Sequence, residues 1–497
     1  MRAAGIVIVI LCMASAPAAQ SLTQDSVRVN VNWGDVRSTA TAFSYGLNVF
    51  AGNAPAVARE AGYGRNLAYM KAGLLRYHYS GLINDSVEDA RGWADSKGKR
   101  WDAAKINDAM NAADGWAKLH GYAPERLINI PKFPAWMKTY SVQIKTKSGE
   151  TKSISLLDRS EYDNFAKFCA DLVRILNVEQ KRGIKYFEAT NERDQIYFVE
   201  FQRADQPDRL DELIEIYNRA AVAMKAVDPT IKVGGPAFTR GDLAEQVRRF
   251  VRGTLPNLDF VTFHFYASSK PADSDEAIFD RTNALSRHTR DIVKILREES
   301  PGRFIPAHVN EYNINYNYRN NEPRMRSHKG AVFDALSIIA AVDAGASATN
   351  AWNERDGGTY GKMDGDNNLR AGAHVYQIFN NYLVGERVAV SSSDERAVVT
   401  FAVKNRAKSL YSYLIVNRSP VVQSIRTNFS NWGTDDGAFF DRHQISAAGY
   451  QTEKIAPQKV TSGEFRVPEH SVTLLTIKAK SASNLPVRIR RNGRRGN

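Results

Sequence analysis

Between about residue 40 and residue 385, short β-rich runs alternate with longer stretches that have the periodicity of helices. Consecutive strands that are joined through a helix pair in parallel, because the helix carries the chain back to the edge at which the next strand begins. Eight such units over roughly 340 residues are typical of a (β/α)8 TIM barrel with insertions, in the α/β class. The candidate strands are residues 42–48, 74–79, 126–131, 185–192, 231–235, 260–266, 304–312 and 347–352.

After about residue 386 the pattern changes to short strands of alternating polarity, with turn residues between them and no convincing helix. This pattern predicts a C-terminal β-sandwich domain. Residues 26–32 alternate in the same way, and we expect this N-terminal strand to join the sandwich. The predicted organisation is a signal peptide (1–20), the N-terminal strand segment (21–39), the barrel (40–385), the sandwich (386–481) and a basic, disordered tail (482–497).

The first 20 residues have the pattern of a secretory signal peptide. Arg2 precedes an apolar run at residues 5–11, and small residues follow at positions 14–16. We expect a secreted chain, extracellular or periplasmic, that starts near residues 17–21. The apolar run is far shorter than the ~20 residues that span a membrane, and no later segment supplies a span.

One cysteine, Cys169, remains beyond the expected signal peptide, so no intrachain disulfide is expected and the core must hold the fold. Cys169 lies in residues 162–172, a run with helical spacing of apolar side chains. A catalytic thiol needs a polar, electropositive environment. The run therefore indicates a buried structural thiol.

The formal net charge of +13 is unevenly distributed. Arg2 and the five arginines of residues 482–497 account for nearly half of it. The mildly basic remainder is compatible with two explanations: attraction of an anionic glycan, or a solvated basic surface without a partner, which is commoner. Binding of nucleic acid is not expected, because no aromatic or motif support accompanies the charge.

Polar side chains gather at or just beyond the C-terminal ends of most candidate strands. In a (β/α)8 barrel these ends form the mouth at which active sites are built, so the bias is itself a functional signal. The residues are Asn48, His78, Asn129, Asn191 with Glu192, His264 with Tyr266, Asn310 with Glu311, and Asn353.

Two glutamates, Glu192 and Glu311, end the fourth and seventh candidate strands, and an asparagine precedes each. These strands lie on opposite sides of a barrel mouth, so the two carboxylates could face each other across a sugar ring. Retaining glycosidases need two carboxyl groups about 5 to 5.5 Å apart. A single glutamate is usually a solvated surface group, but two at matched strand ends favour catalysis. Asn191 could bind the hydroxyl next to the reacting carbon.

These residues resemble glycoside hydrolase clan A, and family 39 most closely. Residues 187–192, Phe-Glu-Ala-Thr-Asn-Glu, are similar to the strand-four pattern of the clan. The resemblance implies that Glu192 is the acid/base and that Asn191 binds the sugar 2-hydroxyl. Residues 308–313 resemble the strand-seven segment, which makes Glu311 the nucleophile.

Three further segments extend the resemblance. Residues 259–266 are similar to the strand-six pattern, in which His264 and Tyr266 line the site and the tyrosine bonds to the nucleophile. Arg76 corresponds to the arginine near the nucleophile, and Trp352 to the aromatic floor of the glycone subsite. Residues 467–473 resemble the closing strand of the accessory sandwich.

The sequence departs from the pattern directly after the acid/base. Many relatives have Pro-Asn there, whereas this chain has Arg193-Asp194, so the resemblance does not assign a substrate. A second Asn-Glu-Arg-Asp stretch contains Glu354, which we interpret as a loop charge rather than a catalyst.

Flat side chains that can stack on sugar rings are expected near the mouth, since sugars present apolar C–H faces. Trp136, Tyr79, Tyr316 and Tyr318 follow strand ends and are candidates. The histidines offer no three-ligand set, so neither a metal nor a cofactor is expected. The predicted substrate-binding residues are Asn191, Arg76, His78, Trp136, His264, Tyr266 and Trp352.

The sequence therefore predicts a secreted retaining glycoside hydrolase. Its partner is a polysaccharide or oligosaccharide, neutral or anionic, cleaved by double displacement with Glu192 as acid/base and Glu311 as nucleophile. Two alternatives stay open. One is a transglycosylase that passes the same intermediate to a sugar, and the other is a non-catalytic glycan-binding protein on the same fold.

Overall fold

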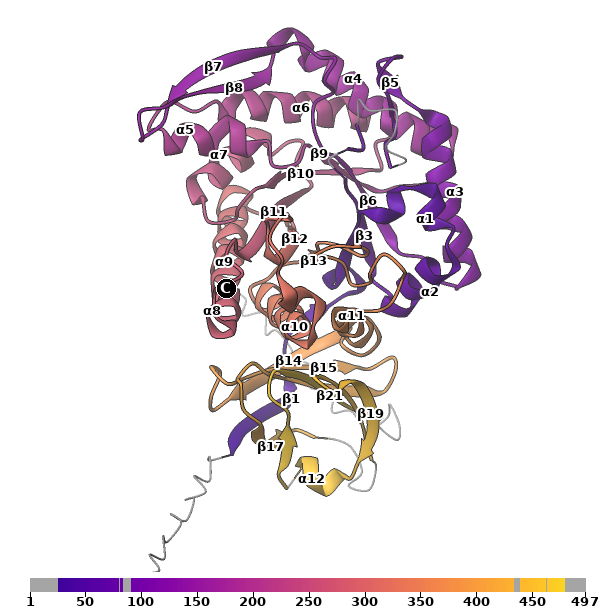
Figure 1. The fold of residues 1–497 in the computed structure, drawn as a ribbon, viewed down its shortest axis with the longest axis vertical. Helices are drawn as coiled ribbons and strands as arrows, with labels where there is room; N and C mark the ends of the chain where they lie inside the picture. Colours follow the sequence, from indigo (N-terminus) through magenta and orange to yellow (C-terminus); the bar gives the residue numbers. More distant parts are fainter. Residues whose placement is uncertain (1–25, 80, 84–90, 433–438, 462, 479–497) are drawn as a thin grey trace, which may run out of the picture.

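The structure is a computed structural model that describes residues 26–79, 81–83, 91–432, 439–461 and 463–478. The predicted signal peptide and basic tail lie outside these residues. The described chain forms a barrel surrounded by helices and, below it in Figure 1, a domain of β-strands. No helix in these ranges is long and apolar enough to cross a lipid bilayer.

Eight parallel strands close into a barrel, as predicted from the alternation of strand-like and helical segments. Their order around the barrel is β10-β11-β12-β13-β2-β3-β6-β9. The strands are β2 (Gly46–Val49), β3 (Leu74–Tyr77), β6 (Glu125–Ile130), β9 (Tyr186–Ala189), β10 (Lys232–Phe238), β11 (Phe260–Ser268), β12 (Ala307–Asn315) and β13 (Ala348–Ala351).

At least one helix follows each barrel strand and covers the outside of the barrel (Figure 1). The longer helices are α2 (Ala61–Met70), α3 (Ala103–Leu119), α4 (Tyr162–Val173), α6 (Leu210–Val227), α7 (Ala244–Thr254), α9 (Thr282–Glu299), α10 (His328–Asp343) and α11 (Ala371–Tyr382). Short helices are α1 (Pro55–Ala58), α5 (Glu200–Arg203) and α8 (Asp275–Asp280). Cys169 is fully buried on α4, which confirms the predicted burial, and burial raises the pKa of its thiol well above the usual value.

Two element boundaries differ from the sequence prediction for local reasons. The first expected strand begins with a 3-10 turn, η1 (Ala42–Ser44), because Thr41 and Ser44 form a capping box. The strand-only region after residue 386 also contains one short helix, α12 (Pro457–Thr461).

Two hairpins are inserted into the barrel. The pair β4 (Ala94–Asp95) and β5 (Arg100–Trp101) precedes α3. The longer pair, β7 (Thr139–Lys145) and β8 (Thr151–Leu157), precedes α4 and extends beyond the helices at the top of Figure 1.

The C-terminal domain is one nine-stranded sheet in the order β19-β18-β21-β16-β15-β14-β1-β17-β20. Rings on β16 and β17 meet although three strands separate them in this order: Tyr413 and Phe429 have centroids 5.9 Å apart. The sheet therefore folds over itself into two layers, which is the predicted sandwich. The strands are β1 (Val27–Ala40), β14 (Gly385–Ser392), β15 (Val398–Asn405), β16 (Leu410–Asn417), β17 (Gln423–Ser430), β18 (Phe440–Ser446), β19 (Gly449–Ile455), β20 (Phe465–Val467) and β21 (Ser471–Lys478).

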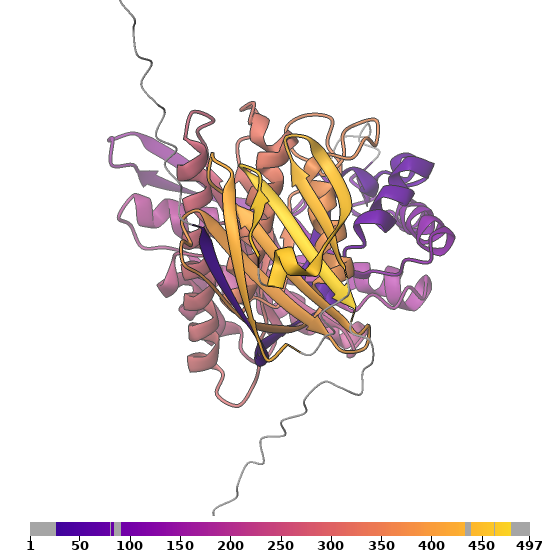
Figure 2. The ribbon, with the colours of Figure 1, turned by 90° about the horizontal axis from the view of Figure 1, so that it is seen from below.

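Strand β1 lies inside this sheet, between β14, to which it is antiparallel, and β17, to which it is parallel. Figure 2 shows it in indigo among the orange and yellow strands. Its residues alternate between buried and more exposed from Val27 to Gly34, and Trp33 packs edge-on against Tyr411 at 4.9 Å between centroids.

The sandwich packs on helices α10 and α11 of the barrel. Side chains such as Leu414 and Leu474 belong to the same buried cluster as the barrel core. Helix α10 is apolar on nearly every side because it lies between the barrel and the sandwich. One face of the sandwich therefore shares an apolar core with the barrel, while the side chains between its two layers form a second core.

We expect Trp33→Ala to lower the free energy of unfolding by about 3–5 kcal/mol, the range for removing a buried large aromatic side chain. Trp33 is 2% exposed, so the substitution leaves a cavity among the rings of the sandwich. Urea unfolding followed by tryptophan fluorescence and circular dichroism measures the change. Phe304→Ala is the control, because Phe304 is 80% exposed. Equal effects of the two substitutions would contradict this account of the core.

Candidate active site

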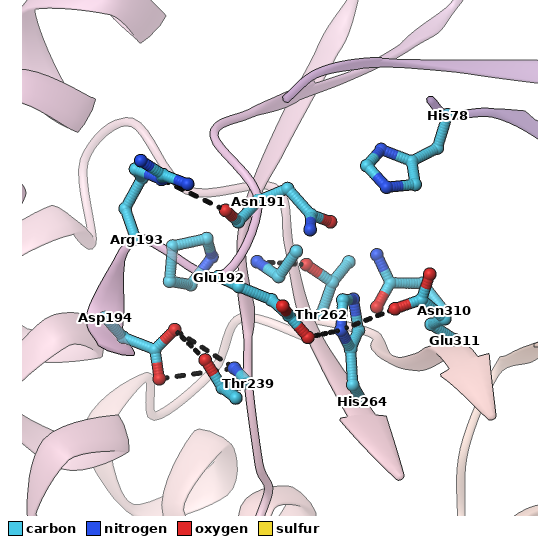
Figure 3. Close-up of polar contacts among 12 residues, drawn as sticks. His78, Asn191, Glu192, Arg193, Asp194, Thr239, Thr262, His264, Asn310 and Glu311 are labelled. Atoms are coloured by element: carbon cyan, nitrogen blue, oxygen red, sulfur yellow. Dashed lines mark hydrogen bonds and ion pairs between the residues drawn. The ribbon is translucent and has the colours of Figure 1, made fainter. Parts of the chain in front are cut away.

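The structure brings Glu192, Glu311 and His264 together at the mouth of the barrel (Figure 3). His264 on β11 lies between the two carboxylates: its Nδ1 is 2.7 Å from Glu192 Oε1 and 2.9 Å from Glu311 Oε2. One oxygen of each carboxylate and one histidine nitrogen all lie within 4.8 Å of one another. Residues from β9, β11 and β12, far apart in the chain, thus form one compact cluster.

The two carboxylates differ in exposure. The side chain of Glu192 is 37% exposed, whereas that of Glu311 is 8% exposed. Glu192 can therefore reach a group that enters or leaves through the mouth, while Glu311 is largely buried.

Burial and charge act in opposite directions on His264 and Glu311. Burial alone would lower the pKa of His264, but Glu311 and Glu192 outweigh it and raise that pKa. Burial alone would raise the pKa of Glu311, but the charge and hydrogen bond of His264 outweigh it and lower that pKa. Glu311 is therefore held as a carboxylate well into the acidic range.

A β-bulge in strand β12 directs two adjacent side chains toward the barrel interior. Phe263 pairs with Val309, but the next residue, His264, pairs with Glu311, so Asn310 is an extra residue. In a regular strand, neighbouring side chains point to opposite faces. Because of the bulge, Asn310 donates to Glu188 inside the barrel while Glu311 faces His264.

Glu192 lies three residues beyond the end of β9, in a tight turn. Its φ is 53° and that of Thr190 is 72°, both in the left-handed region that residues other than glycine seldom adopt. The backbone N–H of Glu192 donates to the carbonyl of Ala237, just inside the end of β10, at 3.0 Å. This turn directs the side chain of Glu192 toward His264 (Figure 3).

Beneath the carboxylates lies a buried ion pair that sequence reasoning did not assign. Arg76 and Glu188 are fully buried, and the Arg76 Nη2 is 2.7 Å from Glu188 Oε2. Arg76 also donates to Asn48 at 2.9 Å and to Asn191 at 2.6 Å. Arg76 therefore positions Asn191, which lies beside the mouth, and its predicted contact with the substrate stays a prediction.

Asn129 extends this network to His78. Its amide donates to Glu188 at 2.7 Å, and its oxygen lies 2.7 Å from His78 Nδ1. Burial, followed by the charge of Arg76, lowers the pKa of His78 to about 3. His78 is thus a neutral side chain with a fixed orientation.

An aromatic cluster borders the network. The ring of Trp352, directly after β13, lies 5.3 Å from Phe50 and 5.5 Å from His78, and Phe50 lies 5.3 Å from Tyr79. Trp352 is partly exposed, so its free surface is available for a sugar face. Phe50 was not singled out in the sequence, because it directly follows its strand β2 amid apolar neighbours.

Trp136, Tyr316 and Tyr318 were also predicted to stack on sugar rings. Trp136 packs edge-on against Phe168 of α4, at 5.8 Å between centroids, so its contacts link it to an outer helix. Tyr316 and Tyr318 are 61% and 68% exposed.

Tyr266 is partly buried, and its ring meets Tyr316 edge-on at 6.4 Å. Burial, followed by the charge of Glu311, raises the pKa of its hydroxyl well above the usual value. Within the described residues, no hydrogen bond joins this hydroxyl to Glu311.

The interpretation of Glu354 as a loop charge is wrong. Its side chain is fully buried and accepts hydrogen bonds from the backbone N–H groups of Phe50 at 2.7 Å and Gly52 at 2.9 Å. Glu354 thereby holds the loop that presents Phe50 to Trp352. The sequence gives no local sign of this, because the donors lie about 300 residues away.

By distance alone, Glu192, His264 and Glu311 could also hold a metal ion. The two carboxylates, however, outweigh burial and raise the pKa of His264, and a protonated Nδ1 offers no lone pair to a metal. The expectation that no metal takes part stays a prediction.

The segment that contains both glutamates is similar to known glycoside hydrolases. The model of "Glycosyl hydrolases family 39" matches residues 166–355, which contain both glutamates. A β-xylosidase from Geobacillus stearothermophilus is 28% identical over 113 residues. The chain is like the glycoside hydrolases of family 39, in clan A. The predicted resemblance to this family is confirmed. The aligned segment spans 21% of this chain and 22% of that β-xylosidase.

Solved structures agree on the fold. A GH39 enzyme from Xanthomonas axonopodis pv. citri has a TM-score of 0.61 at 15% identity, with 93% of this chain and 99% of that chain covered. A family 51 α-L-arabinofuranosidase from Bifidobacterium longum has a TM-score of 0.65 at 13% identity, with 92% of this chain and 100% of that chain covered. This family 39-like chain thus has the barrel and sandwich of those enzymes.

We expect His264→Asn to move the acidic limb of the pH profile of kcat/KM upward by about one to three pH units, the range for losing a nearby opposite charge. The substitution removes the cation that lowers the pKa of Glu311, so burial would then dominate. Initial rates measured from pH 3 to pH 8 provide the test. His288→Asn, on the outer helix α9, should leave the limb in place. An unmoved limb in His264→Asn would show that His264 does not control the ionisation of Glu311.

Proposed function

We propose that the protein is a retaining glycosidase that works by double displacement. The separation of its two carboxylates carries the proposal: one oxygen of Glu192 lies within 4.8 Å of one oxygen of Glu311. Retaining enzymes have carboxyl groups about 5–5.5 Å apart, whereas inverting enzymes leave about 6.5–9.5 Å for a water molecule. The short separation supports direct attack by one carboxylate on the sugar.

In the first step, Glu311 attacks the anomeric carbon and the bond to the leaving oxygen breaks. The lowered pKa of Glu311 keeps it ionised for this attack. Glu192 transfers its proton to the leaving oxygen, and a covalent glycosyl-enzyme remains. In the second step, Glu192 takes a proton from water, the water oxygen attacks the anomeric carbon, and the bond to Glu311 breaks.

The roles of the two glutamates follow from their positions. The acid/base must meet both the leaving group and water, which suits the more exposed Glu192. The nucleophile must lie beneath the sugar ring and stay charged, which suits Glu311. The amide N–H groups of Asn191 are directed by the bond from Arg76 to its oxygen, so Asn191 can donate to the neighbouring sugar hydroxyl.

The proposed substrate is an oligosaccharide or polysaccharide whose terminal or internal ring rests on Trp352. Aryl β-xylosides are the first compounds to test, because one relative is named a β-xylosidase. A hydrolysis screen over neutral and acidic polysaccharides extends the test. Failure of the protein to hydrolyse any of these glycosides would contradict the proposed activity.

Transglycosylation at the same site is the second candidate function. It uses the same intermediate with a sugar acceptor in place of water, and the exposed side of Glu192 admits either. Product analysis with and without an acceptor sugar separates the two reactions. The presence of both carboxylates counts against a non-catalytic glycan-binding protein.

We also propose secretion, based on the basic, apolar and small residues within positions 2–16. The test is the N-terminal mass of the protein recovered from outside the cytoplasm. A chain that retains residues 1–16 would contradict the proposal.

We expect Glu311→Gln to reduce turnover on the order of 10⁴-fold or more, the scale observed when a nucleophile is removed. The amide cannot form the glycosyl-enzyme. Azide should partly restore turnover of an aryl glycoside by Glu311→Gly and yield a product of inverted configuration, detected by NMR. Glu298→Gln, on the outer helix α9, is the matched control and should retain full activity. Hydrolysis by Glu311→Gln at the wild-type rate would contradict the assignment.

We expect Glu192→Ala to lose about 10²–10⁴-fold in kcat/KM on glycosides with poor leaving groups, the usual contribution of a general acid. On activated nitrophenyl glycosides the loss in the first step should be much smaller, because their departure needs little protonation. Steady-state rates on both substrate types measure the difference. Equal losses would show that Glu192 is not the proton donor.

A further inference from the structure

A second buried carboxylate lies behind Glu192. Asp194 is fully buried and immediately precedes the π-helical segment η5 (Gln195–Val199), which continues into α5. Figure 3 shows Asp194 directed away from Glu311 and toward Thr239, so its side chain does not face the substrate. Within the described chain, neither an arginine nor a lysine forms an ion pair with it.

Neutral donors surround this carboxylate instead. The backbone N–H of Thr239 lies 3.0 Å from one carboxylate oxygen and 3.2 Å from the other, and the Thr239 hydroxyl donates at 3.0 Å. The amide of Gln246, itself fully buried on α7, donates at 2.8 Å. Both donors belong to the segment that follows β10, so Asp194 fastens the loop after β9 to the loop after β10.

A second bond ties the same two loops together. The N–H of Glu192 donates to the carbonyl of Ala237, two residues before Thr239. Glu192 and Asp194 are likewise two residues apart. The two pairs, Glu192 with Ala237 and Asp194 with Thr239, therefore join the loops at matching positions on either side of the turn that carries Glu192. Ala237 has a φ of 55°, so the acceptor side of the turn is in the left-handed region as well.

Such a turn needs external support. Residues other than glycine keep a left-handed backbone conformation only where the surrounding structure stabilises it. Burial raises the pKa of Asp194 to about 6, against the hydrogen bonds from Gln246 and Thr239. The hydrogen bonds from Gln246 and Thr239 therefore offset only part of the cost of burying this carboxylate beside the turn of Glu192.

We propose that Asp194 is a positioning residue for proton transfer. By fastening the turn to Thr239 and Gln246, it keeps the carboxyl of Glu192 in line with the leaving oxygen. The inference rests on the proposed role of Glu192 as acid/base and deepens it. Asp194 touches neither the sugar nor the reacting atoms, and acts only through the backbone of Glu192.

The test compares kcat/KM over a series of aryl β-xylosides, or aryl glycosides of whichever sugar the wild type cleaves, with leaving groups of decreasing acidity. Asp194→Ala should lose about 10- to 100-fold on the poorest leaving group, a fraction of the contribution of a general acid. It should lose less than about 3-fold on the best. Asp194→Asn keeps one acceptor oxygen for Thr239 and should lose less than Asp194→Ala.

Two further variants separate positioning from folding. Asp242→Asn changes an exposed aspartate on the same β10–α7 connection and should match the wild type across the series. Thr239→Val removes the hydroxyl donor but keeps the backbone N–H, so it should show a weaker form of the Asp194→Ala pattern. If Asp194→Ala does not fold, as judged by circular dichroism, Asp194→Asn and Thr239→Val still decide the question.

Glu192→Ala measured on the same series keeps the two proposals distinguishable. A leaving-group dependence in Glu192→Ala that reappears, smaller, in the Asp194 variants supports the inference. If Glu192→Ala shows the dependence but the Asp194 variants lose the same amount of activity on every substrate, or lose none, the inference alone is overturned. No dependence in Glu192→Ala overturns both the acid/base role and the inference that rests on it.

Discussion

The buried ion pair of Arg76 and Glu188 is the interaction on which the mouth of the barrel depends. Neither charge has access to water, so each must be compensated by groups fixed around it. Asn48, Asn129 and Asn310 supply those groups, and they come from β2, β6 and β12. The pair thus joins five of the eight strands just beneath the site. The same contacts orient Asn191, and through Asn129 they orient His78.

Much of the site could be predicted because two local signals coincide. Polar residues at the ends of apolar runs are visible in the sequence, and a (β/α)8 barrel brings those ends to one mouth. Glu192, His264 and Glu311 are recognisable in this way, and the structure brings them within contact distance. The resemblance to family 39 adds roles to the positions, but the convergence itself follows from strand order.

The residues that could not be predicted owe their roles to distant partners. Glu188 stands inside a β-rich run, and only the fold reveals Arg76, 112 residues away, as its counter-ion. Asp194 and Glu354 look like loop charges, yet both are fully buried and bound to backbone N–H groups of other loops. Trp136 has the right position after a strand, but its orientation is set by packing on α4. Periodicity reports which face of a strand a residue occupies, not which distant group it meets.

The place of β1 in the sandwich has a consequence for the order in which the protein can fold. Its partners, β14 and β17, begin more than 340 residues later in the chain. During synthesis the whole barrel emerges between the first strand of the sandwich and the strands that cover it. Until then both edges of β1 are unpaired, a state that favours wrong pairings between chains. Closure of the sandwich is therefore a late, long-range event that fastens the two ends of the described chain around a barrel that can already have formed.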